Sequence, residues 1–143
     1  MFIFKTLIKD KLVDNATIKG LFNAAATGSC AVRMAELQMS ATYPQILIDY
    51  VGGPTEPGMD AEQGRLYLRI ESQGSGSEHP IKNLGFFRSA ILNIIDDTAI
   101  ASTAVAYHLR KSFESGEHYD EENKCYFNTI GFETWIKQDF SKP

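Results

Sequence analysis

The sequence has little of what a disulfide framework, a zinc site or a membrane segment requires. Its two cysteines, Cys30 and Cys125, lie far apart and form no CxxC pair, so both are expected to be buried thiols. No apolar run reaches the roughly 18 residues of a transmembrane helix. Lysines also interrupt the apolar residues of "MFIFKTLIKDKLVDN", where a signal peptide would carry a continuous apolar region. These absences predict a protein that is made in the cytoplasm and does not enter a membrane.

The sequence also lacks an excess of positive charge. Its net charge is −4 and its pI is about 5.3. Proteins that hold phosphate backbones carry clustered basic residues, so nucleic acid is not expected as a specific ligand. Apolar residues make up 43% of the 143 residues. This is enough for one core, and we interpret residues 1–143 as one domain.

Two stretches have apolar residues at helical spacing. The first predicts an amphipathic helix over residues 3–13, followed by a short second helical turn that ends near Gly20. The other predicts a helix over residues 81–95, with Pro80 in its first turn. The apolar positions are Phe4, Leu7, Ile8 and Leu12 in the first stretch, and Leu84, Phe87, Ile91, Leu92 and Ile95 in the second.

Several other stretches alternate apolar and polar residues with the period of a strand. "PQILIDYV" and "GRLYLRIES" are the clearest, and "CAVRMAEL" fits a strand or a helix, with the strand favoured. "TAVAYHLRKSFES" and "KCYFNTIGFETWIKQ" predict a terminal antiparallel hairpin. The predicted fold is α+β, with a mainly antiparallel β-sheet and two amphipathic helices packed on one face.

Two connections stand out in this scheme. An arm over residues 52–64 is rich in Gly, Pro and acidic residues and is longer than an ordinary hairpin loop. A polar hairpin tip covers residues 114–123. Arg110 and Lys111 are expected to be edge-strand charges, whereas Phe132 and Trp135 are expected in the core or a subunit interface.

Catalytic patterns are weak. "SQGSGSEHP" contains Ser75, Ser77, Glu78 and His79, but it has neither a GxSxG pattern between strand and helix nor the Lys-Ser/Thr ending of a phosphate-binding loop. A flexible loop is favoured. A small hydrolase or ligand-binding domain is the alternative from another class, and it requires Ser77, His79 and His108 to converge around a pocket.

The tip "ESGEHYDEEN" gathers enough carboxylates for a divalent cation in principle. It lacks both the spaced pattern of a calcium loop and the HExxH pattern of a zinc enzyme. A solvated hairpin tip explains its composition, and His108 is expected to be a satisfied or solvent-facing strand residue. No catalytic residue, cofactor or metal site is therefore expected.

A set of motifs extends from the first helix to Lys137. "FKTLIKDKLVDNATIKGLF" is a helix with a second turn, "TYPQILIDYVGG" is a strand opened by Pro44, and a variable arm follows. "LYLRIESQGSGSEHPIKNLGFFRSAILNIIDD" is a strand, a small-residue loop and a helix, before a last strand pair. In these features the chain resembles the tail-completion or tail-terminator proteins of tailed bacteriophages, prophages and related tail-like devices.

The resemblance implies a structural protein that forms a ring, commonly a hexamer, on the end of the tail tube. The ring stops polymerisation and joins the tail to the head, so the implied partners are the tube protein and a head-completion or connector protein. It also implies assembly in the host cytoplasm, a place at the head–tail junction of the virion, and a lumen that passes DNA without specific binding. Another head–tail connector or a minor capsid component is the alternative within this class.

A ring needs two different contact patches on each subunit, and the exposed strand edge, the arm and the tip are the candidates. Doubling the length of a loop costs only about 0.6 kcal/mol of closure entropy, so a long arm can reach a neighbouring subunit and become ordered there. The candidate interface residues are Pro54, Glu56, Pro57, Met59, Asp60 and Glu62 in the arm, and Glu117, His118, Tyr119 and Asp120 in the tip.

Overall fold

The computed structural model describes residues 2–24, 31–35, 43–52, 61–73, 79–96, 98–101 and 105–138. The helices are α1 (Phe2–Val13), α2 (Ala16–Ala24) and α3 (Pro80–Ile95), and the strands are β1 (Val32–Met34), β2 (Gln45–Gly52), β3 (Ala61–Ser72), β4 (Thr98–Ala101), β5 (Val105–Glu114), β6 (His118–Asp120) and β7 (Cys125–Gln138). Among these described residues, no helix combines the length and apolarity needed to cross a membrane. The α+β class is confirmed.

All the strands belong to one sheet. Its order is β1-β2-β3-β7-β5-β4, and β6 pairs with the beginning of β7. Only the β1–β2 pair is parallel among the described pairs, because the others follow one another through hairpins or pair in opposite directions. The prediction of a mainly antiparallel sheet is therefore confirmed.

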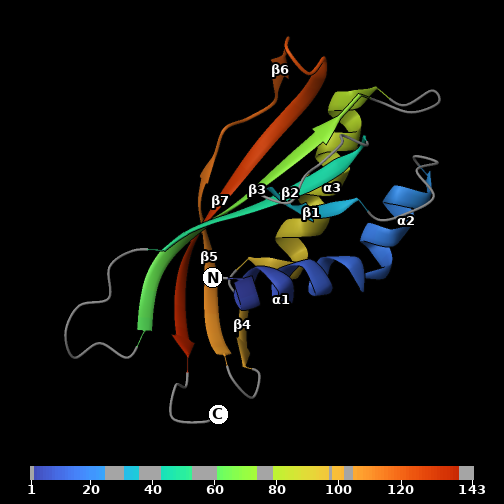
Figure 1. Ribbon diagram of the computed structural model, residues 1–143. Coiled ribbons are helices and arrows are strands. Elements are labelled where there is room, and N and C mark those ends of the chain that lie inside the picture. The colour runs from blue at the N-terminus through green and yellow to red at the C-terminus, as the bar shows by residue number, and fades with distance from the viewer. Residues whose placement is uncertain are drawn as a thin grey trace.

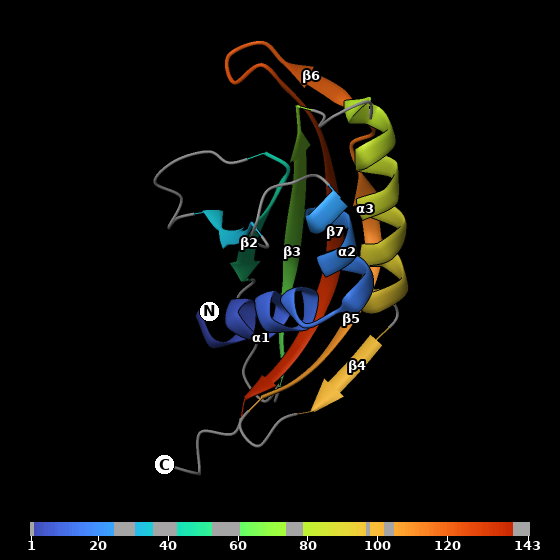
Figure 2. The same ribbon diagram turned by 90° about the vertical axis from the view of Figure 1, so that its right-hand side faces the viewer.

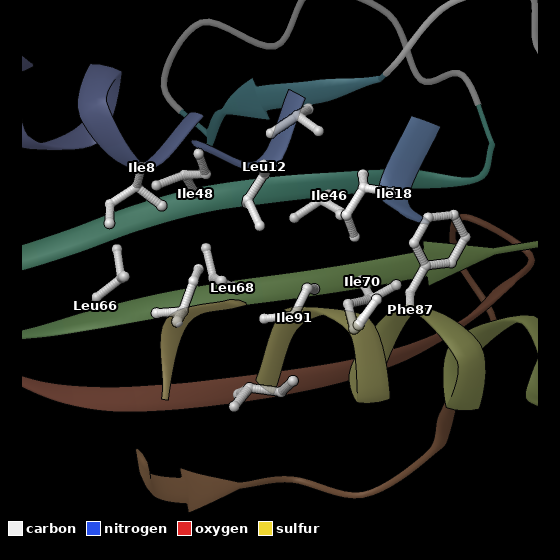
Figure 3. Close-up of a cluster of buried hydrophobic side chains, with 14 of the residues drawn as sticks. Ile8, Leu12, Ile18, Ile46, Ile48, Leu66, Leu68, Ile70, Phe87 and Ile91 are labelled. Carbon is white, nitrogen blue, oxygen red and sulfur yellow. The ribbon is translucent and has the colours of Figure 1, made fainter. Parts of the chain in front are cut away.

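The helices all lie on one side of the sheet (Figures 1 and 2). Between the two layers is a continuous apolar core, in which side chains of α1, α2 and α3 meet the alternate residues of β2, β3 and β7 that point inward. Figure 3 shows the central part of this core. It includes Ile8, Leu12, Ile18, Ile46, Ile48, Leu66, Leu68, Ile70, Phe87 and Ile91, each at most 2% exposed.

Helix α2 is longer than the sequence predicted. Its start is capped by Asn15, whose Oδ1 accepts the backbone N–H groups of Thr17 at 2.9 Å and Ile18 at 3.2 Å. The prediction ended this turn near Gly20, but the helix continues past it. A glycine within a helix costs about 1 kcal/mol relative to alanine, which is less than the gain from burying Ile18 and Phe22 in the core. In the described part of the chain the layer therefore contains three helices, where the sequence predicted two helices and a short turn.

Helix α3 begins where the sequence predicted. His79 Nδ1 accepts the backbone N–H of Ile81 at 3.2 Å, and Pro80 occupies the first turn, where a missing N–H costs nothing. One face of the helix is buried against the sheet. The predicted helix over residues 81–95 is confirmed.

A charged network joins α3 to the hairpin formed by β5 and β7. Arg88 donates to Glu114 through Nε and, at 2.9 Å, through Nη2. Lys111 Nζ lies 2.8 Å from Oε2 of this carboxylate, and Asn128 Nδ2 donates to Oε1 at 2.9 Å. Chiefly because of the hydrogen bond from Arg88, the pKa of Glu114 is lowered to about 2.

Strand β4 is an addition to the predicted order. It forms the sheet edge beside β5 only as far as Leu109. Arg110 and Lys111 lie beyond this pairing, where no described strand covers that edge of β5, so their interpretation as edge-strand charges stands for this part of the strand. The β4 register ends opposite Leu109, and the backbone N–H of Lys111 donates at 2.8 Å to Oδ1 of Asp96. The Lys111 ammonium belongs to the ion pair with Glu114. Short strands such as β4 are missed because four residues carry too little periodicity.

The boundaries of the arm and the tip also change. β2 runs to Gly52 and β3 begins at Ala61, so the described strands shorten the predicted arm of residues 52–64 from both ends. β5 likewise runs to Glu114, and β6 lies within the predicted tip. The pairing of β3 with β7 includes residues outside the stretch in which apolar and polar residues alternate. Polar residues such as Glu62 pair there through the backbone.

Candidate functional site

The sheet face that no helix covers carries a groove. Two adjoining hollows, of about 530 and 480 Å³, lie on it and share Arg65, Tyr67 and Glu133. Odd-numbered residues of β3 and β7 point to this face, since their even-numbered neighbours fill the core. The name "sheet groove" is used here for the surface lined by Val51, Arg65, Tyr67, Phe113, Gly131, Glu133 and Trp135.

Gly131 forms part of the groove because it has no side chain. A Cβ atom at this position would lie 3.2 Å from both Phe113 Cβ and Tyr67 Cε1. These two aromatic side chains therefore approach each other across the glycine, and Phe113 stays 51% exposed. An exposed aromatic side chain beside a hollow is typical of a contact surface.

The groove has a row of charges across three strands. Glu133 on β7 pairs in register with Arg65 on β3 and with Arg110 on β5, and all three residues are exposed. Trp135 follows on the same face, with its ring 5.6 Å from that of His108. Arg110 lies beyond the residues that line the two hollows, so the row extends from the groove onto β5. As a whole the row holds two guanidinium groups for one carboxylate, and this end of the sheet face favours an acidic partner.

A second candidate surface is the hairpin tip, for which residues 114–124 are meant from here on. It projects beyond the N-terminal end of α3 (Figures 1 and 2). Asp120 closes its turn: Oδ1 accepts the backbone N–H groups of Glu122 at 3.0 Å and Asn123 at 3.2 Å, and Oδ2 accepts the Asn123 side-chain amide at 3.0 Å. These bonds, above all those from Asn123, lower the pKa of Asp120. Tyr119, 49% exposed, packs on Tyr126 with ring centroids 4.9 Å apart.

The tip is fastened to β3. Arg69 Nη2 donates to Asp120 Oδ2 at 3.0 Å, and its Nε donates to Glu71 Oε2 at 3.2 Å. The guanidinium also lies 3.9 Å from the centroid of the Phe127 ring. Gln73 Nε2 donates to two backbone carbonyls of the turn at 3.2 and 3.4 Å. Contacts from β3 therefore hold the tip in one position.

Beneath the tip is a buried polar cluster. Glu71, 3% exposed, accepts a bond of 2.6 Å from Gln45 Nε2 and lies 3.5 Å from the thiol of Cys125. Burial, with the nearby Glu71 carboxylate, raises the pKa of Cys125 to about 11. Burial also raises the pKa of Tyr43 to about 12. The prediction of a buried thiol is confirmed for Cys125, while Cys30 lies outside the described residues.

Three of these groups are close enough to be considered as metal ligands. One ligand atom each from Glu71, Asp120 and Cys125 lies within 4.8 Å of the other two. Arg69 already supplies a positive charge to both carboxylates, and the raised pKa of Cys125 keeps the thiol protonated, whereas a metal requires the thiolate. The donor set fits a structural network better than a metal site.

The free edge of β2 is protected against strand pairing. β1 pairs only with residues 46–48, which leaves the rest of β2 at the edge of the described sheet. Ile46 N donates toward β1, so the N–H of Tyr50 points to the same edge, where it donates at 2.9 Å to Oδ1 of Asp49. A charged side chain folded over an edge is a known protection against pairing with another chain. The strand edge is thus a poorer contact patch than the sequence suggested.

The predicted interface residues fall into two groups. Pro54, Glu56, Pro57, Met59 and Asp60 lie outside the described residues. Glu62 lies on β3 opposite Ile136. Glu117, His118, Tyr119 and Asp120 lie together on the hairpin tip.

The residues of the hydrolase alternative do not converge. Ser75, Ser77 and Glu78 lie outside the described residues. The ring of His79 is 5.8 Å from Tyr126 at the beginning of β7, whereas His108 lies beside Trp135 near its end. Tyr126 and Trp135 are nine positions apart along β7, or about 30 Å. His79 and His108 therefore cannot act in one active site.

Sequence reasoning missed the sheet groove. The polar second face of "RLYLRIES" was a signal that this side of the sheet lacks helices, and a glycine inside a strand marks a close approach of neighbouring groups. The groove itself arises only from the register that brings Tyr67, Phe113 and Gly131 together from three strands. Trp135, expected in the core or at an interface, is half-buried on the groove, whereas Phe132 is fully buried in the core.

Comparisons with known proteins bear on the fold. No family model and no curated protein matches the chain. Among solved structures, the fold is similar to that of a chain in the virion of a native gene transfer agent (GTA) particle, with a TM-score of 0.65 and 10% sequence identity. The similarity covers 91% of this chain and 91% of that chain. The helices, the sheet and their connectivity are thus those of a fold that occurs in a virion.

Proposed function

We propose that this protein is a structural component of a phage-like virion, and specifically a tail terminator that forms a ring on the end of the tail tube. The observation that carries the proposal is the similarity in fold to a chain of the gene transfer agent virion over 91% of both chains. The sequence motifs that resemble tail terminators provide independent support, because they cover the same elements, from α1 to the end of β7.

In this proposal the protein acts by binding other proteins through its surfaces and catalyses no reaction. The ring, expected to be a hexamer, stops polymerisation of the tube and presents a surface to the head-completion or connector protein. The arm and the hairpin tip provide contacts. DNA passes through the lumen without specific binding, in keeping with a net charge of −4. The ring assembles in the host cytoplasm and remains at the head–tail junction.

The first experiment measures the molar mass of the purified protein by light scattering, alone and with tail tubes, and images the same fractions by negative-stain electron microscopy. A ring of about six subunits, or a monomer that becomes a ring on tube ends, supports the proposal. A monomer indifferent to tubes refutes it. A ring that binds head connectors and ignores tubes instead identifies a different head–tail joining protein.

A further inference from the structure

We propose that the hairpin tip of one copy docks in the sheet groove of the next copy. This inference rests on the proposed function, because it names the two patches that close the ring. A closed ring requires a heterologous contact, in which two different surfaces of the same chain meet. The tip and the groove are two such surfaces.

Shape favours this pairing. The tip is a narrow hairpin that projects from the body (Figure 1), and the groove is a pair of adjoining hollows lined by residues of four strands, β2, β3, β5 and β7. Tyr119 on the tip and Phe113 in the groove are about half exposed, at 49% and 51%. Burying such side chains against each other is a main source of affinity at interfaces.

Charge favours it as well. The tip contains five carboxylates and one lysine, and Glu117, Glu121 and Glu122 among them are exposed. Arg65 in the groove and Arg110 beside it on β5 lie on either side of Glu133. An acidic hairpin next to a row with more guanidinium groups than carboxylates is electrostatically complementary, which steers association and excludes wrong orientations.

The tip is also rigid before it binds. Asp120 closes the turn, Arg69 fastens it to β3, and Tyr119 packs on Tyr126. A preorganised element loses little conformational entropy on docking. The contact cannot form within one molecule, because Tyr119 and Phe113 pair with positions of β7 that are five residues apart, about 17 Å along the strand.

A disulfide test follows from this distance. In the double variant Tyr119→Cys/Phe113→Cys, a disulfide forms between copies only where a tip meets a neighbouring groove, because the two Cα atoms must come within about 7 Å. Under mild oxidation we expect a ladder of covalent multimers on a non-reducing gel. Each single variant should give no ladder. Tyr119→Cys/Lys19→Cys is the control for docking of the tip on the helices.

Charge reversal provides the second test. Glu121→Lys/Glu122→Lys should weaken ring formation, measured by light scattering, by at least about tenfold in concentration. Arg65→Glu/Arg110→Glu should do the same, and the two pairs of changes combined should restore the ring. Asp10→Lys/Asp14→Lys makes the same charge change on exposed carboxylates of the helical layer and should leave the ring intact. If the variant Arg65→Glu/Arg110→Glu does not fold, the variant Arg65→Gln/Arg110→Gln is used in its place.

The outcomes separate this inference from the proposed function. A wild-type protein that forms no ring, alone or with tubes, refutes the function. A wild-type ring without a Tyr119→Cys/Phe113→Cys ladder, and with charge-reversed variants that still assemble, overturns only the docking of tip in groove. A ladder in the Lys19→Cys control places the tip on the helices and also overturns it. If groove variants form rings and lose only tube binding, the groove belongs to the tube protein.

Discussion

At Gly64, β3 leaves room for a side chain from the neighbouring strand. The Tyr50 ring lies over this glycine, and a Cβ atom there would come within 2.7 and 2.8 Å of two of its ring carbons. Tyr50 is held in place by an edge contact with Phe4, with centroids 5.3 Å apart. We predict that Gly64→Ala lowers the free energy of unfolding by about 1–3 kcal/mol, because the ring has to move out of its packed position. Urea unfolding followed by circular dichroism measures this change.

Gly85 provides the control for that substitution. It lies in α3, and a Cβ atom there would meet nothing within 4 Å. Gly85→Ala is expected to raise the free energy of unfolding by up to about 1 kcal/mol, because alanine restricts the unfolded chain and favours the helix. Equal effects of the two substitutions would contradict the packing assigned to Tyr50.

Glu114 gives the protein a predictable response to acid. Its pKa is lowered from 4.5 to about 2 in the folded state, so the carboxylate stabilises the fold above pH 4.5, and this contribution is lost as the pH falls from about 4.5 to 2. We predict that Glu114→Gln lowers the free energy of unfolding by about 1–3 kcal/mol at pH 7, and that the difference from wild type shrinks toward pH 2. Urea titrations at several pH values test this. Glu117→Gln, at an exposed position of the same hairpin, should change little at any pH.

Among the elements, the hairpin tip depends on one side chain of β3. Arg69 connects Glu71 and Asp120, and Glu71 is 4% exposed at its side chain. We predict that Arg69→Met lowers the free energy of unfolding by about 2–3 kcal/mol, because it leaves a buried carboxylate without its cation. The amides of the tip should exchange faster with deuterium.

Arg65 is the matched control for Arg69. It lies on the same strand and the same sheet face, but it is exposed. Arg65→Met should change the free energy of unfolding by less than about 0.5 kcal/mol and leave the exchange of the tip amides unchanged. If the tip amides of Arg69→Met exchange with deuterium as slowly as those of the wild type, the turn keeps its position without β3.

The elements that could be predicted are those with enough periodicity to be read locally. Residues 46–50 and 66–70 alternate over a full strand, and α1 and α3 have apolar stripes of several turns. Residues 61–63 of β3 pair with residues 135–137 of β7, which are far away in sequence. β4 and β6 pair with neighbouring strands, but at four and three residues they are too short to show a period. Local patterns do not carry that information.

The candidate surfaces also divide into one that local sequence could predict and others that it could not. The tip is one continuous stretch, so its polar composition predicted a hairpin tip that includes Glu117, His118, Tyr119 and Asp120. Its role as a contact region came from the ring that the resemblance implies, and it stays a prediction. The sheet groove and the cluster around Glu71 are assembled from strands more than fifty residues apart in sequence. They follow from register, which a one-residue shift would destroy.

The whole molecule is electrostatically asymmetric. Residues 2–24 and 79–96, which include the three helices, carry six basic and three acidic side chains, whereas the chain as a whole has a net charge of −4. The remaining part is therefore acidic, and the hairpin tip contributes much of that charge. This overall balance does not itself select the groove, because the tip and the groove both lie outside the basic helical layer; docking of the tip in the groove depends on the local charges of Arg65 and Arg110 and on the exposed Phe113.

The local charges of the tip and the groove predict how the ring responds to salt. The contact between the tip and the groove involves exposed charges, whose attraction is screened beyond about 8 Å at physiological ionic strength and beyond about 3 Å at 1 M. We therefore predict that raising the salt concentration from about 0.05 to about 0.5 M shifts ring formation to higher protein concentration. Light scattering across a dilution series measures the shift. The Glu121→Lys/Glu122→Lys protein should lose most of this dependence, and assembly that strengthens with salt would show that apolar contacts, such as those of Phe113 and Trp135, dominate the interface.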